Sequence, residues 1–171
     1  MNSAGLLTCG YSIDDLREAI ATPRVGPRPS MPEVLPHIQL DQWPPDGLVG
    51  RLLARAASLD GVIVRQSRMA HPDSAALALS DDCASGPTEA FIDVPEFCHL
   101  HAAPPGGIHL TLPPAILGPA IAGAWAEIHP AARSGCISPY LAVVYAPRDE
   151  RELAVSLVLV GASWSFARGL F

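Results

Sequence analysis

Closely spaced prolines in the first third of the chain constrain its folding more than any other feature; they stand at positions 23, 27, 29, 32 and 36. Each proline lacks a backbone N–H and restricts the residue before it, so this segment cannot form a regular helix or strand. Upstream of it, Ser12 followed by Asp14 and Asp15 predicts a helix start, because the serine caps free N–H groups and the acids complement the helix dipole. We therefore expect residues 1–46 to form a short helix and an extended arm, which wraps the domain or packs against a second copy of the chain.

Residues 47–171 are expected to form one α+β domain, since a chain of 171 residues is of single-domain size. Apolar residues at near-helical spacing predict helices at 48–59, 114–125 and 149–167, the last apolar on most faces and therefore buried. Apolar or β-branched runs between turn residues predict strands at 62–64, 75–79, 89–92, 97–101, 108–112 and 140–145. Residues 126–139 are expected to be a loop. This mixture favours an antiparallel or mixed sheet covered by helices.

Charge and hydropathy exclude two classes of partner. The formal net charge is −6 and the 11 Lys and Arg residues are scattered, whereas a nucleic-acid surface needs clustered positive charge. No apolar run reaches the ~20 residues that cross a bilayer, and we see no signal peptide, so we expect a cytoplasmic protein without a membrane partner. The four cysteines form no CxxC pair, so we expect reduced thiols at Cys9, Cys83, Cys98 and Cys136.

Four of the histidines are concentrated in one region of the chain: His99, His101, His109 and His129. On a strand, His99 and His101 face the same side, because side chains alternate with period two. If residues 102–106 form a hairpin loop, His99 lies directly opposite His109, with Cβ atoms about 5 Å apart. Three imidazoles then converge on one patch, which a register slip of one residue would destroy.

Converging imidazoles support three kinds of chemistry. Their neutral nitrogens can bind Zn, Fe, Ni or Cu with open positions for substrate or oxygen, and His99, His101 and His109 are the candidate ligands. Without a metal, the rings can act as general bases on an acidic organic substrate. They can also hydrogen-bond within a polar cleft and do nothing further. His37 and His71 stand alone in the sequence and are interpreted as structural.

Four further residues each have two interpretations. Glu96 belongs on the opposite strand face unless a bulge intervenes, and either supports a histidine or forms an ordinary salt bridge. Trp125 is a core or pocket-wall aromatic, and Tyr145 offers its hydroxyl to the cleft or makes a structural hydrogen bond. Arg148 holds a substrate anion or pairs with a neighbouring acid. We take Glu96 and Trp125 as candidate substrate-binding residues, and Tyr145 and Arg148 as candidate catalytic residues.

Several motif blocks occur together in the C-terminal half. They are Glu96-Phe97-Cys98-His99-Leu100-His101, Ile108-His109-Leu110, Gly123-Ala124-Trp125-Ala126-Glu127-Ile128-His129-Pro130 and Val144-Tyr145-Ala146-Pro147-Arg148-Asp149-Glu150. In this order and spacing they resemble the luciferase-domain family typified by fungal luciferase, over residues 89–167. Fungal luciferases have an N-terminal membrane-spanning helix that we do not expect here, so the chain is more similar to bacterial relatives that share the domain without evident light emission. The family's usual Gly-Trp is Ala124-Trp125 in this sequence.

The resemblance implies both a pocket and an activity. Fungal luciferases oxidise a hydroxylated α-pyrone with molecular oxygen and need no added organic cofactor. By resemblance, the histidines His99, His101, His109 and His129 deprotonate the substrate or hold a divalent metal, while Tyr145 and Arg148 orient it. We therefore expect an oxygenase acting on a small acidic enolic or aromatic molecule, with oxygen as co-substrate. The competing expectation is a non-catalytic module that binds a small ligand or metal, with the arm serving contacts in a homo-oligomer.

Overall fold

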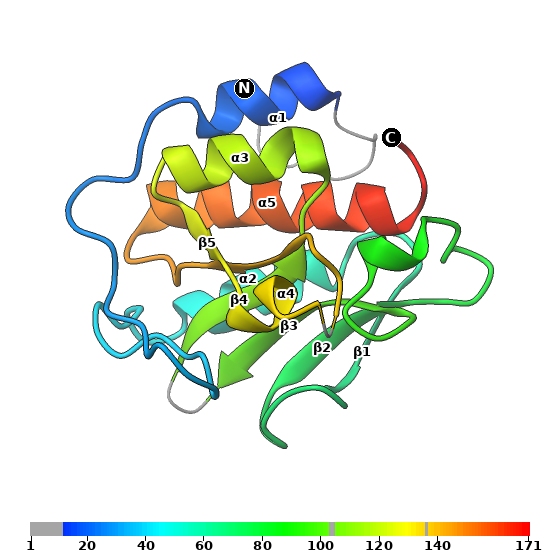
Figure 1. Cartoon of the computed structure of the whole chain (residues 1–171), viewed down its shortest axis with the longest axis horizontal. Helices are drawn as coiled ribbons and strands as arrows, with labels where there is room; N and C mark the ends of the chain where they lie inside the picture. The colour runs from blue at the N-terminus through cyan, green and yellow to red at the C-terminus, as the bar shows by residue number, and fades with distance from the viewer. Residues whose placement is uncertain (1–11, 103–104, 136) are drawn as a thin grey trace.

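Six antiparallel strands form a central sheet, and the longer helices pack on one of its faces (Figure 1). The computed structural model describes residues 12–171 apart from 103, 104 and 136. In sheet order the strands are β1 (Val62–Gln66), β2 (Ala75–Leu79), β3 (Glu96–Ala102), β4 (Pro105–Thr111), β6 (Leu141–Val144) and β5 (Ala126–Ile128). The helices are α1 (Ile13–Ile20), α2 (Leu48–Ala56), α3 (Pro114–Ala122), α4 (Pro130–Arg133) and α5 (Glu150–Ala167), with a 3-10 turn η1 (Thr88–Ala90). This is the single α+β domain that the sequence predicts, with purely antiparallel pairing.

Helix α5 is the centre of the helical layer. The side chain of Asp149 caps its first turn by accepting the Glu152 N–H, and nearly every residue of the helix is buried, as its apolar composition predicts. The helix contacts β3 and β4 on the sheet side and α1 and α2 within the layer. Figure 1 shows α1, α3 and α5 together on the same side of the sheet. Most of the buried apolar residues of the main core lie in or against this layer. Each leucine buried there stabilises the fold by about 1.5–3 kcal/mol.

The two faces of the sheet differ in chemistry because side chains alternate along each strand. Leu77, Cys98 and Leu110 are fully buried in the core that the helices cover. Their neighbours point the other way, and His99 pairs with Ala76 on one side and with His109 on the other. The face that the main helices leave open therefore carries the histidines.

A bulge in β3 brings Glu96 to the histidine face. The β2–β3 register shifts between Leu77 and Ala78, so that Ala78 pairs with Glu96. One extra residue on β3 reverses the alternation at this point. The sequence left open whether such a bulge exists, and the structure shows that it does.

A second bulge lies where β4 passes His101. The β3–β4 register shifts beyond Leu100, and Ala102 pairs with Pro105. The extra residue falls in Gly106-Gly107, and Gly107 has a φ of +74°, a conformation that residues with a Cβ rarely adopt. This glycine lets β4 absorb the bulge while the pairing of His99 with His109 is kept.

Three sequence predictions for the connections were wrong. Residues 89–92 contain the end of η1 rather than a strand. Ala90, Phe91 and Ile92 are buried apolar residues, and burial alone gave the run its strand-like composition. The hairpin loop is shorter than 102–106, since the strands continue to Ala102 and begin again at Pro105; residues 103 and 104 lie outside the described part. The expected loop 126–139 contains β5 and α4, and a strand of 3 residues is too short to show a periodic pattern.

The arm, residues 21–46, contains no helix or strand, as its prolines predict. It is nevertheless anchored by buried polar side chains. Arg24 lies 3.5 Å from the carboxylate of Glu152, with both side chains almost inaccessible. Gln39 is fully buried and accepts the Ala146 N–H at 3.0 Å. The arm is thus fixed against the domain at the end of β6.

In the described part of the chain, no helix is both long and apolar enough to cross a membrane. The thiols of Cys83 and Cys98 are free, as expected. Cys9 and Cys136 lie outside the described residues.

Replacing Gly107 by alanine should destabilise the protein by about 1–2 kcal/mol, because the φ of +74° strains any residue with a Cβ. The matched control is Gly50→Ala in α2, where an added Cβ meets nothing within 4 Å. This control should be neutral or stabilising by up to about 1 kcal/mol, because alanine favours the helix. Urea unfolding measures both, and equal stabilities of the two variants would contradict the bulge.

Candidate functional site

A cavity of about 610 Å³ lies over the histidine face of the sheet, bordered by the arm, by residues 69–71 and by the segment that follows β5. Its walls are mostly apolar and include Leu35, Pro36, Ile38, Met69, Ile92 and Ile137. All four clustered histidines line it: His99, His101, His109 and His129. This size and this mixture of apolar wall and a few polar groups are typical of small-molecule sites.

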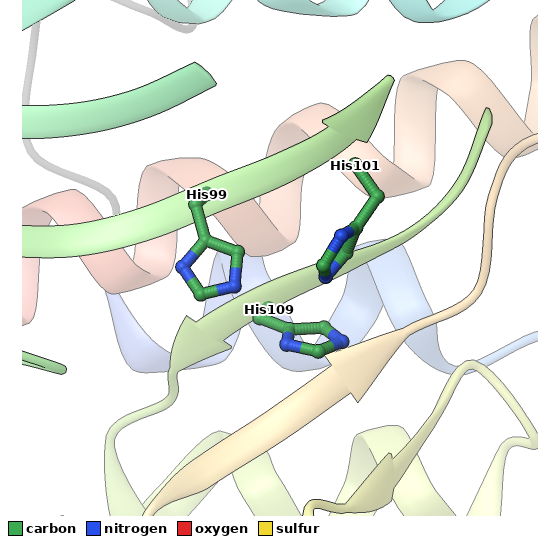
Figure 2. A group of neighbouring side chains, drawn as sticks. All are labelled: His99, His101 and His109. Atoms are coloured by element: carbon green, nitrogen blue, oxygen red, sulfur yellow. The ribbon is translucent and has the colours of Figure 1, made fainter. Parts of the chain in front are cut away.

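The predicted convergence of three imidazoles is confirmed. His99 pairs directly with His109 across β3 and β4, and His101 follows two residues along β3. The ring centroids are 4.8 Å apart for His99 and His109, 5.3 Å for His99 and His101, and 4.6 Å for His101 and His109. Figure 2 shows the three rings turned toward one another from the two strands. The fourth, His129, follows β5, and its ring lies 4.9 Å from that of His109.

Glu96 holds the ring of His99. His99 Nδ1 lies 2.8 Å from Glu96 Oε1, which also accepts a hydrogen bond from the Ser67 hydroxyl at 2.8 Å. Burial acts to raise the pKa of Glu96, but the hydrogen bonds from His99 and Ser67 outweigh it and hold that pKa below its ordinary value. The carboxylate is therefore ionised at neutral pH and fixes the proton of His99 on Nδ1, so the neutral ring has its lone pair on Nε2.

The other two rings on the strands are held by different groups. His109 Nε2 lies 3.0 Å from the carbonyl oxygen of His37, which can only accept, so the proton of the neutral ring is on Nε2 and the lone pair on Nδ1. His101 Nδ1 lies 3.3 Å from the hydroxyl of Ser74. The Nε2 atoms of His99 and His101 are buried without a hydrogen-bond partner among the described residues.

His129 is held in a different way. Its Nδ1 accepts the backbone N–H of Ala131 at 3.1 Å and so caps α4. The lone pair of Nδ1 is used in that bond, and the proton of the neutral ring is therefore on Nε2. His129 consequently brings a hydrogen-bond donor to the cavity rather than a free lone pair.

Burial and mutual proximity keep the rings of His101, His109 and His129 neutral. Burial, followed by the neighbouring His99 and His129, lowers the pKa of His101 to about 4. Burial, followed by His37, lowers the pKa of His129 to about 4 as well. The pKa of His109 lies well below its ordinary value for the same reason. At neutral pH these imidazoles carry no charge and can serve as bases or ligands.

Three residues at or beside the cavity were not among the predicted site residues: His37, His71 and Glu127. His71, interpreted as structural, lines the cavity. His37, also interpreted as structural, lines the cavity, and its ring nitrogens lie 2.7 Å from the Pro32 carbonyl and 2.7 Å from Glu127 Oε1. Both neighbouring oxygens can accept a hydrogen bond from the ring. Glu127 precedes His129 by two positions, and strand periodicity could have placed both on one face. His37 lies in an arm without periodicity, so the sequence gives no signal for it.

The remaining candidate residues do not line the cavity. Tyr145 is buried and donates its hydroxyl to Glu127 Oε2 at 2.8 Å; burial, together with this bond, raises the pKa of Tyr145 well above its ordinary value. Arg148 pairs with Glu152, the salt-bridge interpretation left open by the sequence. Trp125 is packed in the core and donates to the Thr22 carbonyl at 3.2 Å. None of the three is among the residues that line the cavity.

Comparison with known families agrees with the motif resemblance. Residues 95–163 match the family model described as Luciferase domain. The match includes all four histidines of the cluster and most of α5, and it covers somewhat less than half of the chain. Neither the curated proteins nor the solved structures gave a match. The resemblance predicted from the sequence is therefore confirmed over this segment.

The low pKa of His129 predicts a pH-dependent stability. Between about 6.5, the ordinary value, and 4, the unfolded state binds more protons than the folded state, so the free energy of unfolding falls as the pH is lowered through this window. His129→Asn keeps an N-cap acceptor for Ala131 but removes the titrating ring. We expect the slope of unfolding free energy against pH to decrease by up to ~1.4 kcal/mol per pH unit in this variant.

Urea unfolding in the presence of a chelator, at pH values from 4 to 7, measures this slope. Ser134→Ala, at the end of α4, is the control, because it changes the same segment of the chain without removing a titrating group. A slope in His129→Asn equal to that of the unmodified protein would contradict the buried, neutral state of His129.

Proposed function

We propose that this protein is a luciferase-like oxygenase that acts on a small acidic enolic or aromatic molecule, such as a hydroxylated pyrone, with molecular oxygen as co-substrate. One observation carries the proposal: a largely apolar cavity has several buried, neutral imidazoles on one side. The match to the Luciferase domain supports the same chemistry, because it includes these imidazoles.

The cavity fits a flat ring with an acidic hydroxyl. Its volume of about 610 Å³ lies within the ~300–1,000 Å³ of small-molecule pockets. Ile38, Ile92 and Ile137 offer apolar contact to the ring, while the clustered histidines on the sheet offer polar atoms. A substrate would therefore bind with its hydroxyl toward the histidines, where Nε2 of His129 can donate a hydrogen bond to the oxygen.

The first chemical step in this proposal is removal of a proton. An imidazole that is neutral at pH 7 takes the enolic O–H proton, and the resulting enolate has an electron-rich carbon. Molecular oxygen forms a C–O bond at that carbon, and return of the proton gives a hydroperoxide. A metal held by the same histidines would be a second way to stabilise the enolate oxygen.

A non-catalytic module for a small ligand or metal is the second candidate. The observation that favours it is the position of Arg148 and Trp125, which support the fold instead of lining the cavity. Such a module would bind a ligand stoichiometrically and consume no oxygen.

Oxygen consumption with hydroxylated pyrones and phenols tests the proposal. The double variant His99→Ala/His101→Ala should reduce uptake at least ~100-fold, because general-base catalysis alone contributes about 10²–10⁴-fold. The matched control is Cys98→Ala, which removes a buried side chain from the opposite face of the same strand and should keep most of the activity. Circular dichroism checks the fold of both. Unchanged oxygen uptake in a folded double variant would refute the proposal.

A further inference from the structure

The clustered imidazoles fall into two groups according to where the lone pair of each neutral ring lies. The Nε2 atoms of His99 and His101 are buried and unpartnered among the described residues, and Nδ1 of His109 is left as the basic nitrogen because its Nε2 donates to the arm. One nitrogen from each of these three rings lies within 4.8 Å of the other two. His129 differs, since its Nδ1 lone pair is already used by the Ala131 N–H.

We infer that His99, His101 and His109 bind one divalent first-row transition-metal ion, and that His129 stays outside its coordination sphere. The use of this ion in oxidation rests on the proposed function, whereas its binding does not. Three neutral imidazole nitrogens suit Zn, Fe, Co, Ni or Cu and do not suit Mg or Ca, which prefer oxygen ligands.

The groups behind the three rings support this assignment. Glu96 fixes His99, the His37 carbonyl fixes His109, and the Ser74 hydroxyl is in reach of His101. A metal-binding histidine almost always donates its other N–H to a carboxylate, carbonyl or water in this way. Unpartnered buried nitrogens cost free energy in a protein interior, and a bound ion removes that cost for His99 and His101.

The geometry needs only a small closure. Nitrogens around a tetrahedral ion with bonds of about 2.0–2.1 Å are roughly 3.3 Å apart, so the rings must approach by at most ~1.5 Å. The two paired strands fix the backbone positions of the three histidines. Rotation of the side chains alone can therefore supply this small movement. Since the three rings line the cavity, the open positions of the ion face the space for substrate.

Metal titration tests the inference without reference to activity. Chelator-treated protein is titrated calorimetrically with Co²⁺ and Zn²⁺, with Mg²⁺ as the negative control, and the visible absorbance of Co²⁺ reports its coordination. We expect one ion per chain. Glu96→Gln should weaken binding by about 10–100-fold, because it removes the group that orients His99. His109→Gln, which removes a ligand, should weaken metal binding further. His101→Gln is a second variant of the same kind and should do the same.

His129→Asn separates this site from a general histidine patch. It should change the affinity for Co²⁺ less than threefold and leave the absorbance unchanged. Three results would overturn the inference. The unmodified protein could fail to bind Co²⁺ or Zn²⁺, or the folded His109→Gln and His101→Gln variants could both bind as tightly as the unmodified protein. The third is a loss of affinity in His129→Asn as large as that in His109→Gln. Stoichiometric binding without oxygen uptake would leave the metal site standing and refute only the proposed function.

Discussion

The rest of this structure depends on one constraint: imidazole rings are buried on the face of the β-sheet that the main helices do not cover. A polar ring that is nearly inaccessible to water needs hydrogen-bond partners, and those of His99, His101 and His109 come from three different parts of the chain: Glu96, Ser74 and the His37 carbonyl. Glu96 reaches His99 only because β3 bulges, and the arm reaches His109 through a backbone carbonyl. The bulges and the arm can therefore be understood as consequences of placing these histidines where they are.

One face of the sheet carries the hydrophobic core, and the other carries the histidine cluster. Helix α5 and its neighbours bury an apolar face and supply most of the stabilising area. The opposite face carries the polar cluster under the arm, whose position is fixed by the buried pair Arg24–Glu152. Arg148 reinforces this pair by binding the same carboxylate, so its position is explained by the anchoring of the arm.

The sequence predicted the parts of the site that depend on regular periodicity. Alternation along a strand placed His99 and His101 on one side, and a hairpin placed His99 opposite His109, all of which the structure confirms. Periodicity could not predict the contacts that irregular segments make with the site. His37 joins the site from the arm, where prolines remove any period, and Glu96 required a bulge that the sequence could only name as a condition.

The protonation pattern of the imidazole nitrogens is the most direct test of this arrangement. Nitrogen–proton correlation NMR on the metal-free protein at neutral pH distinguishes the two neutral forms of each ring. The hydrogen bonds predict a proton on Nδ1 of His99 and on Nε2 of both His109 and His129. A proton on Nδ1 of His109 or of His129 would contradict the assignment of lone pairs and, with it, the three-histidine site.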